Sequence, residues 1–455
     1  MAGTLAEATR TRPRHTSKAA FAALLGFFVV EYVRPGIYVP ILEAVHVNSI
    51  IPLTAFALAL FAPAGRANAA IFRQPITRWM LFFVALFFVQ FLTVDVRLYV
   101  FEKLGAVAGY VLIYYAILRN VTSIARFKAV FATLIGVHVV MLVLHPGVVL
   151  EPEKRHYVGG TFLGDGNDFA WSACIVVPLA HFLFRHDRRP AWRYAYLLAL
   201  LLLIIAVIGT QSRGGSIALA LVSLYLVAWS KRRAAGLALL AVVAGVVLFV
   251  APPAYFERME SVSTYQADGS AQGRLSAWNS ALRMALDHPF TGVGAGHFSV
   301  KFGLEYRPPG VGRREMPWLN AHSIYFVALG EFGFSGIVFL LAVIGSGFLG
   351  CGSVRKRLHR RNGPRESELR ELALAVQCSL IGFAVAGTFL SGLYYPHLFV
   401  VSALCVAVML LERDDRGAQP EASAAPGTRE QPASLTAAIP DARMRHLRSG
   451  SARRW

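Results

Sequence analysis

His322 is the residue of this 455-residue chain best suited to acid–base chemistry. It lies in the segment Asn320-Ala321-His322-Ser323-Ile324-Tyr325, which opens an apolar run, so that Asn320 can cap a helix whose first turn contains His322. The positive end of a helix disfavours an imidazolium, and a neutral imidazole can accept a proton. The segment therefore predicts a general base. The alternative is an interfacial histidine hydrogen-bonded to water.

Arg213 could bind an anion. It lies in the turn Thr210-Gln211-Ser212-Arg213-Gly214-Gly215 between two apolar runs, at the expected start of the second. Glycines let backbone approach a ligand, and the free N–H groups and dipole of a helix start favour negative charge. These features predict a phosphate or pyrophosphate site in which Ser212 and Gly214 support Arg213. The alternative is an arginine that extends its side chain to lipid headgroups.

Arg274 opens a second candidate anion site, in the first turn of an expected amphipathic helix. Four apolar residues share one face of that helix at helical spacing and would lie on the membrane or on the bundle. They are Leu275, Trp278, Leu282 and Leu286. Trp278 is interpreted as an anchor at the membrane interface. Arg283 falls on the opposite face and is expected to be solvated.

A glycine-rich turn follows at Thr291-Gly292-Val293-Gly294-Ala295-Gly296-His297. It is similar to a phosphate-binding loop, but no predicted strand precedes it, and the pattern alone is weak evidence. We interpret it as a compact turn.

Glu331 lies nine residues after His322, on the other side of the same predicted helix. It therefore cannot orient His322 directly. A carboxylate within an apolar run is expected to face the protein interior, where it could pair with a buried arginine.

The composition restricts the class of protein that must position these residues. The chain is 56% apolar and 16% charged, against roughly a quarter charged in soluble domains, which excludes a soluble or a disordered protein. Its four cysteines lie in apolar stretches without a CxxC pair, so disulfide and zinc frameworks are not expected. Asp165 and Asp168 stand three residues apart without a histidine cluster, and neither a catalytic metal nor a cofactor is indicated.

The apolar runs predict an all-α polytopic membrane protein with about twelve transmembrane helices. The runs are 19–33, 44–65, 79–94, 101–118, 129–150, 168–184, 194–212, 215–230, 234–256, 332–354 and 372–411, the last long enough for two spans. The predicted organisation is an N-terminal tail at 1–18, nine spans at 19–251, a large outer loop at 252–319, three spans at 320–411 and a disordered tail at 412–455.

The distribution of basic residues predicts which side of the membrane each loop occupies. With both termini in the cytoplasm, the clusters at 66–78, 119–128, 185–193, 231–233 and 355–370 all fall inside. The formal charge of +19 then reflects topology, and these short clusters between apolar runs do not form a nucleic-acid-binding face. The loop 252–319 and the three candidate site residues lie outside.

Taken together, these residues resemble the O-antigen ligase and polymerase superfamily of bacterial envelope glycosyltransferases, over about residues 160–345. The resemblance depends on Thr210-x-Ser212-Arg213-Gly214, on Arg274 with Trp278, on His288-Pro289-x-x-Gly292-x-Gly294, on His322-Ser323 in a helix continuing to Glu331-x-Gly333, and on the stretch from Gly160 through Asn167 to Phe169. Ser323 stands where the family usually has asparagine in a His-Asn-x-Tyr pattern that also includes Tyr325.

The resemblance implies a GT-C-like fold with one large periplasmic loop, in the bacterial inner membrane. It implies transfer of a glycan from an undecaprenyl-pyrophosphate carrier to an acceptor, with His322 as the base and Arg213 and Arg274 binding the pyrophosphate. Asn167, Ser212, Gly214, Trp278, Asn320, Ser323, Tyr325 and Glu331 would support them. The expected reaction inverts the sugar and needs no metal.

The acceptor separates the functions that the resemblance leaves open. A ligase uses a lipid A-core sugar, a polymerase uses another carrier-linked repeat unit, and a protein O-oligosaccharyltransferase uses a serine or threonine. We favour the ligase. A transporter is a different alternative, but it should place charged pairs or broken helices near mid-membrane in both halves, whereas the polar residues here gather at the outer helix ends.

Overall fold

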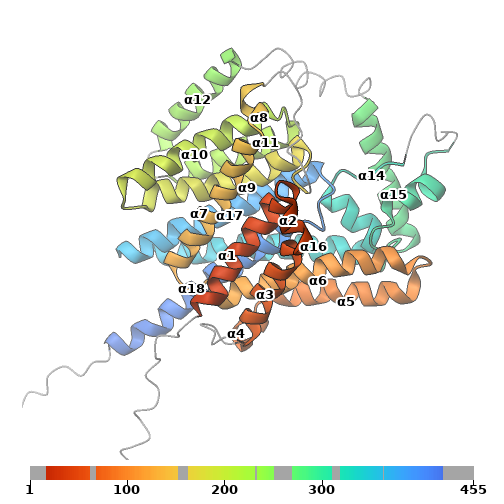
Figure 1. Ribbon diagram of the computed structural model, residues 1–455, viewed down its shortest axis with the longest axis horizontal. Coiled ribbons are helices and arrows are strands. Elements are labelled where there is room, and N and C mark those ends of the chain that lie inside the picture. The colour runs from red at the N-terminus through yellow and green to blue at the C-terminus, as the bar shows by residue number, and fades with distance from the viewer. Residues whose placement is uncertain are drawn as a thin grey trace, which may run out of the picture. The chain divides into compact units, whose positions relative to one another are not determined.

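The computed structural model describes residues 17–61, 68–151, 162–230, 233–250, 269–309, 318–361 and 363–423, and these residues form helices and connecting turns without a strand (Figure 1). Met1–Arg413 form one compact unit, and Asp414–Trp455 are assigned to a second. The helices of the first half are α1 (Lys18–Val33), η1 (Pro35–Ile37), α2 (Pro40–Ala44), α3 (Val47–Phe61), α4 (Asn68–Phe72), α5 (Pro75–Thr93), α6 (Arg97–Asn120), α7 (Ile124–Leu144), α8 (Gly147–Leu150) and α9 (Gly166–His186). Those of the second half are α10 (Pro190–Gly209), α11 (Arg213–Ala228), α12 (Arg233–Val250), α14 (Gly269–Asp287), α15 (Phe298–Lys301), η2 (Phe302–Tyr306), α16 (Ile324–His359), α17 (Pro364–Ala386), η3 (Gly387–Phe389) and α18 (Pro396–Ser423).

Local sequence explains where many of these helices begin. Proline occupies the first helical position of α5, α10 and α17, where its missing N–H would have no helical partner anyway. Serine side chains cap the first turns of α1, α7 and α11. Each apolar run predicted as a span contains a helix, so the prediction of an all-helical membrane protein is confirmed at this level.

The number of spans is not confirmed. Eight of the described helices are long and apolar enough to cross a membrane. α3 has 15 residues and α11 has 16. At 1.5 Å per residue such helices are about 23 Å long, shorter than a hydrocarbon core of about 30 Å. Twelve spans therefore remain a prediction.

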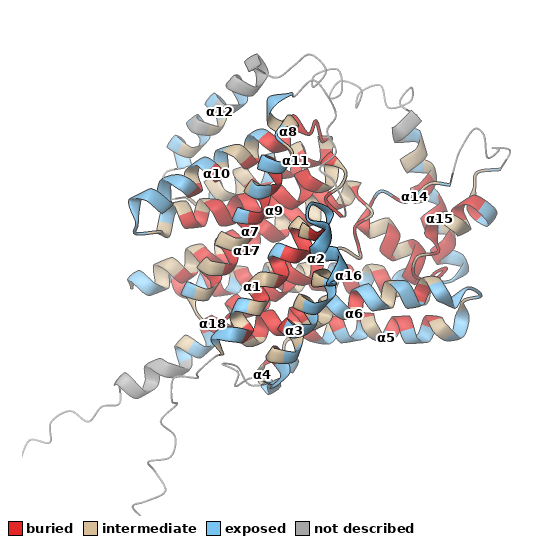
Figure 2. Ribbon diagram, in the orientation of Figure 1, coloured by how far each residue is buried: buried red, intermediate tan, exposed pale blue. Residues whose placement is uncertain are grey.

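Helix α9 lies at the centre of the packing that positions the candidate site. It packs against α7, α10, α11 and α17, and α17 packs in turn against α11 and α16. Figure 2 shows α9 as almost entirely buried, whereas α5 and α10 present exposed surfaces. Gly382 of α17 allows a close approach, because a Cβ there would come within 2.7 Å of the Cys174 carbonyl oxygen.

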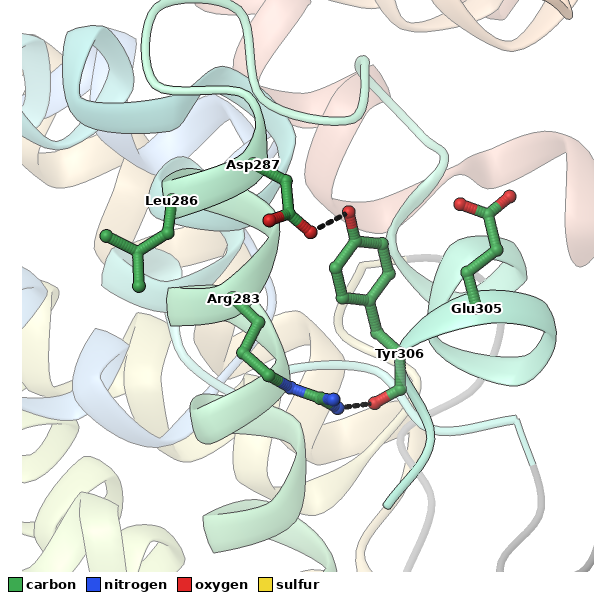
Figure 3. Close-up of a pocket in the computed structure, with 5 residues that line it drawn as sticks. All are labelled: Arg283, Leu286, Asp287, Glu305 and Tyr306. Carbon is green, nitrogen blue, oxygen red and sulfur yellow. Dashed lines mark hydrogen bonds between the residues drawn. The ribbon is translucent and has the colours of Figure 1, made fainter. Parts of the chain in front are cut away.

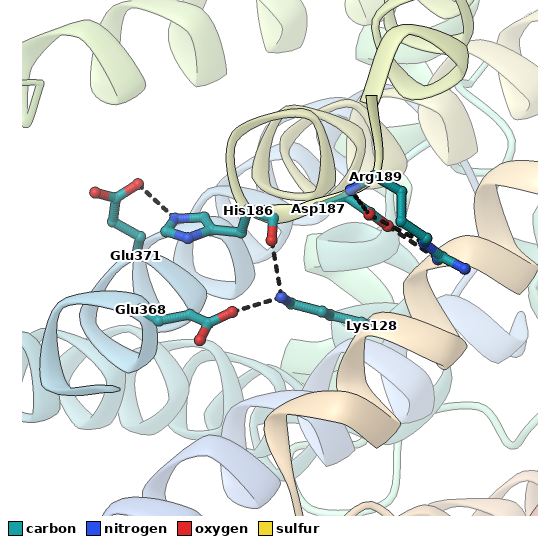
Figure 4. A network of polar contacts seen from close by, with 6 residues as sticks. All are labelled: Lys128, His186, Asp187, Arg189, Glu368 and Glu371. Atoms are coloured by element: carbon teal, nitrogen blue, oxygen red, sulfur yellow. Dashed lines mark hydrogen bonds and ion pairs between the residues drawn. The ribbon is translucent and has the colours of Figure 1, made fainter. Parts of the chain in front are cut away.

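Ionic contacts join the start of α7, the end of α9 and the start of α17 (Figure 4). Lys128 pairs with Glu368 at 2.6 Å and donates to the His186 carbonyl oxygen at 3.0 Å, while His186 and Glu371 lie 2.8 Å apart. These side chains are partly exposed, so each pair contributes at most about 1 kcal/mol. Their role is to keep three helices in register at the end opposite the candidate site.

One predicted domain boundary differs from the structure. Disorder was expected from residue 412, yet α18 continues to Ser423, and Arg357 holds the buried Glu412 through hydrogen bonds of 3.2 and 3.0 Å. The predicted N-terminal tail and residues 424–455 lie outside the described residues. Within 252–319, the described residues form α14, α15 and η2.

Candidate active site

His322 lies immediately before α16, which corrects its predicted place inside the first turn. Ser323 is the N-cap, with extended backbone, and the helix begins at Ile324. His322 itself has a φ of 47°, in the left-handed region that side-chain-bearing residues seldom adopt. Its backbone N–H donates to the Ser391 hydroxyl at 2.7 Å. The Asn320 side chain does not cap the helix and accepts from the Ala321 N–H at 3.0 Å instead.

Arg274 and Asp165 are the charged neighbours that act on His322. Burial lowers the pKa of His322 below its ordinary value near 6.5, the charge of Arg274 lowers it further, and Asp165 opposes both effects. His322 also keeps an exposed surface, so the neutral ring remains accessible. Arg274 thus lies close enough to His322 to affect its pKa. Burial and Arg274 lower that pKa, whereas the sequence had suggested the helix dipole as the cause.

Asp165 also belongs to the site, although it was not among the residues predicted for the site from the sequence. It caps α9 by accepting from the Asn167 N–H at 3.2 Å, and the Asn167 side-chain amide also donates to it. Asn167 therefore orients Asp165. The Asp-Gly-Asn spacing is a helix-capping signal, but the effect of Asp165 on His322 depends on a chain segment more than 150 residues away.

Trp278 positions the residue before His322. Its indole N–H donates to the Ala321 carbonyl oxygen at 2.8 Å, and its ring stacks on Phe326 with a centroid distance of 4.8 Å. The role of Trp278 as a membrane-interface anchor stays a prediction, since the side chain is half-buried. α14 packs on α16 through its small residues, including the buried Ala277 and Ala281, and its leucines are exposed.

The turn around Arg213 is packed tightly against neighbouring helices. Ser212 caps α11 by accepting from the Gly215 N–H at 3.2 Å. A Cβ on Gly214 would come within 2.7 Å of the Phe389 ring, and one on Gly215 within 2.7 Å of the Ala170 side chain. These glycines therefore allow neighbouring side chains of the protein to pack closely. From the sequence we had expected them to allow a close approach of a ligand.

The segment 387–391 connects Arg213 with His322. Phe389 contacts Gly214, and Ser391, two residues later, accepts the His322 N–H. Gly387 packs against Ile324, the first residue of α16. The starts of α9, α11 and α16 and the end of α17 therefore meet at one end of the bundle.

Tyr325 and Ser323 flank the site differently. The Tyr325 hydroxyl donates to the Ala384 carbonyl oxygen at 2.9 Å and joins α16 to α17. The Ser323 hydroxyl is buried beside His322 and has no hydrogen-bond partner among the described residues. Because buried hydroxyls are usually paired, the unpaired Ser323 hydroxyl is an unusual feature next to His322.

Glu331 belongs to a separate cluster with the glycine-rich turn. Its buried carboxylate accepts from the N–H groups of Gly296 and Phe298 at 2.9 and 3.1 Å, and from the Tyr394 hydroxyl. The suggested arginine partner was wrong, while the inward orientation was right. The backbone N–H groups of this turn bond a carboxylate of the protein itself, so they are not free to bind a phosphate. The turn is therefore compact and structural, as we predicted.

Gly292→Ala is expected to destabilise this cluster by more than about 2 kcal/mol. Gly292 has a φ of 61°, and a Cβ there would lie 2.3 Å from the Glu331 carbonyl carbon. Left-handed backbone costs an L-residue about 1–2 kcal/mol, and overpacking typically adds about 1–3 kcal/mol. Thermal unfolding of the detergent-purified chain measures the effect. Gly105→Ala is the control, because nothing lies within 4 Å of a Cβ there. Equal melting temperatures for the two variants would contradict the assigned packing.

Comparison with protein-family models matches residues 198–341 to the family described as O-antigen ligase. The matched segment contains Arg213, Arg274 and His322. No curated protein matches the chain.

Proposed function

Since residues 198–341 place this chain in the O-antigen ligase and polymerase superfamily, we propose that it transfers a glycan from undecaprenyl pyrophosphate to a hydroxyl of a lipid A-core sugar. The observation that carries the proposal is that His322, with a lowered pKa and exposed surface, lies within the electrostatic reach of Arg274 at one end of the helices. A neutral base beside a fixed cation suits attack on a donor that carries a pyrophosphate.

In the proposed reaction, His322 accepts the proton of the acceptor hydroxyl as its oxygen attacks the anomeric carbon. The new C–O bond forms while the bond from that carbon to the pyrophosphate oxygen breaks, which inverts the configuration. The proton held on His322 then passes to solvent or to the departing pyrophosphate. General base catalysis of this kind typically contributes about 10²- to 10⁴-fold in rate.

Arg274 and Arg213 neutralise the leaving group in this mechanism. Pyrophosphate departs readily once its developing charge is stabilised, so cations help more than a general acid. The bound donor also alters the base, because its negative charge offsets the effect of Arg274 on the pKa of His322. His322 would therefore remain unprotonated in the free protein and become a stronger base when the donor binds.

The proposed setting is the bacterial inner membrane, with about twelve spans, both termini in the cytoplasm and the site at the periplasmic face. The basic clusters of the sequence support this orientation. The partners would be the lipid-linked glycan donor, the lipid A-core acceptor and membrane lipids. No role for a metal or a cofactor enters the mechanism.

Deletion of the gene in its native host, followed by electrophoresis of envelope polysaccharides, tests the choice of acceptor. We expect long chains to disappear from lipid A-core while carrier-linked polymer accumulates. Lipid A-core capped with single repeat units would indicate a polymerase instead. An unchanged ladder would overturn the ligase proposal and direct attention to glycosylated proteins or transport.

The pH dependence of kcat/KM should reveal the charges around His322, because kcat/KM reports ionisations of the free enzyme. Protonated His322 cannot act as a base, so the acidic fall in activity should lie below pH 6.5. Removing the negative charge with Asp165→Asn should lower the pKa of His322 and move the fall to a lower pH. Removing the positive charge with Arg274→Gln should raise that pKa and move the fall of the residual activity upward. Shifts in the opposite directions would contradict the assigned neighbours.

A further inference from the structure

A cavity of about 330 Å³ lies between the end of α14 and η2, away from His322 (Figure 3). It is lined by Arg283, Leu286, Asp287, Glu305 and Tyr306. Arg283, expected to be solvated, is half-buried, and its guanidinium donates to the Tyr306 carbonyl oxygen. The size falls within the range of small-molecule sites.

The lining combines hydrogen-bond donors and acceptors around a tyrosine ring. Asp287 accepts from the Tyr306 hydroxyl at 2.9 Å, and Glu305 accepts from Lys301 at 2.6 Å. An ionised carboxylate has about four acceptor positions, so both acids can accept further bonds. The Nε atom of Arg283 is buried and has no hydrogen-bond partner among the described residues. A hydroxyl-rich ligand matches this mixture better than an anion, because two of the three charged lining residues are acidic.

Two features of the backbone beside the cavity are unusual. Phe302–Tyr306 form a π-helical turn, a rare conformation that is frequent at functional sites. Asp287 is the last residue of α14, where the negative end of the helix dipole disfavours a carboxylate. Its hydrogen bond with the Tyr306 hydroxyl offsets part of that cost.

The position of the cavity limits which part of a substrate it can hold. Asp287 lies thirteen residues after Arg274 on the same helix, which is about 20 Å at 1.5 Å per residue. The transferred sugar must react near His322 and Arg274. A ring in the cavity would therefore belong to the same glycan several sugar units away.

We propose that this cavity is a saccharide subsite, in which Arg283, Asp287 and Glu305 bind the hydroxyl groups of one sugar ring of a glycan substrate. The proposal rests on the proposed glycan transfer. The ring comes either from the glycan of the donor or from the core of the acceptor, and both present the same chemistry to the cavity.

The test uses the full chain purified in detergent and two probes prepared from the native host. One is delipidated O-polysaccharide, and the other is core oligosaccharide released from lipopolysaccharide by mild acid. Leu286→Trp should narrow the cavity, because Leu286 lines it and removing the leucine breaks no polar contact. Leu282→Trp is the matched control, since Leu282 is 44% exposed, lies one turn earlier and does not line the cavity.

We expect Leu286→Trp to raise the Kd of one probe at least about tenfold by titration calorimetry, and Asp287→Asn to weaken the same probe by a smaller factor. The KM of the corresponding substrate should rise while kcat stays within about twofold, a split expected when ground-state binding is lost. An effect on the polysaccharide assigns the cavity to the donor, and an effect on the core assigns it to the acceptor. Unchanged Kd values for both probes would overturn the subsite and leave the proposed transfer standing. Probe binding that depends on Leu286 in a chain without transfer activity would overturn the proposed function instead.

Discussion

His322→Asn is expected to lower the transfer rate by about a hundredfold or more while leaving the chain inserted and folded. Asparagine tolerates left-handed backbone, so it suits the φ of 47° at this position and can retain the N–H contact with Ser391. Its amide cannot accept a proton from an acceptor hydroxyl at neutral pH. The loss should therefore appear in kcat and not in the affinity for donor. Initial rates with a purified lipid-linked donor and lipid A-core measure it.

The matched control is His145→Asn. His145 is also a partly exposed histidine in a connection between helices, but it hydrogen-bonds Tyr38 at 2.8 Å and has no role in the proposed mechanism. The control should keep activity near that of the unmodified chain. If His322→Asn also kept it, with equal melting temperatures for both variants, His322 would not be the base.

Arg213→Lys and Arg274→Lys are expected to lower turnover by at least about tenfold each, although both keep the positive charge. Arginine offers a planar fork that can make two parallel hydrogen bonds to a phosphate, and lysine acts as a point charge. Since the charge of the leaving group grows during the reaction, the loss should be greater in kcat than in donor binding.

Arg189→Lys serves as the control for these substitutions. Arg189 is largely exposed beyond the far end of α9 and pairs with Asp187 at 3.2 Å, so its replacement should leave turnover unchanged. If Arg274→Lys impaired the chain and Arg213→Lys did not, the pyrophosphate site would be limited to Arg274. Normal turnover by both lysine variants would remove bidentate binding from the mechanism.

Many helix positions could be predicted from the sequence because the signals for them are local. Apolar runs of sufficient length show which segments are helical, and Ser212 and Pro364 begin α11 and α17 through interactions within the first turn. The compact form of the glycine-rich turn and the inward orientation of Glu331 could be predicted for the same reason. The candidate roles of His322, Arg213 and Arg274 likewise followed from residue type, helix ends and resemblance.

Only the tertiary structure determined which groups surround those residues. Asp165, Trp278 and Ser391 come to the His322 segment from three distant parts of the chain, and Arg283 becomes part of a cavity only because η2 packs against α14. Hydropathy and helical spacing report which face of a helix is buried, but they do not report which other helix covers it. Hydrogen-bond partners and pKa values depend on that second fact, so the environment of the site followed from packing between segments far apart in sequence.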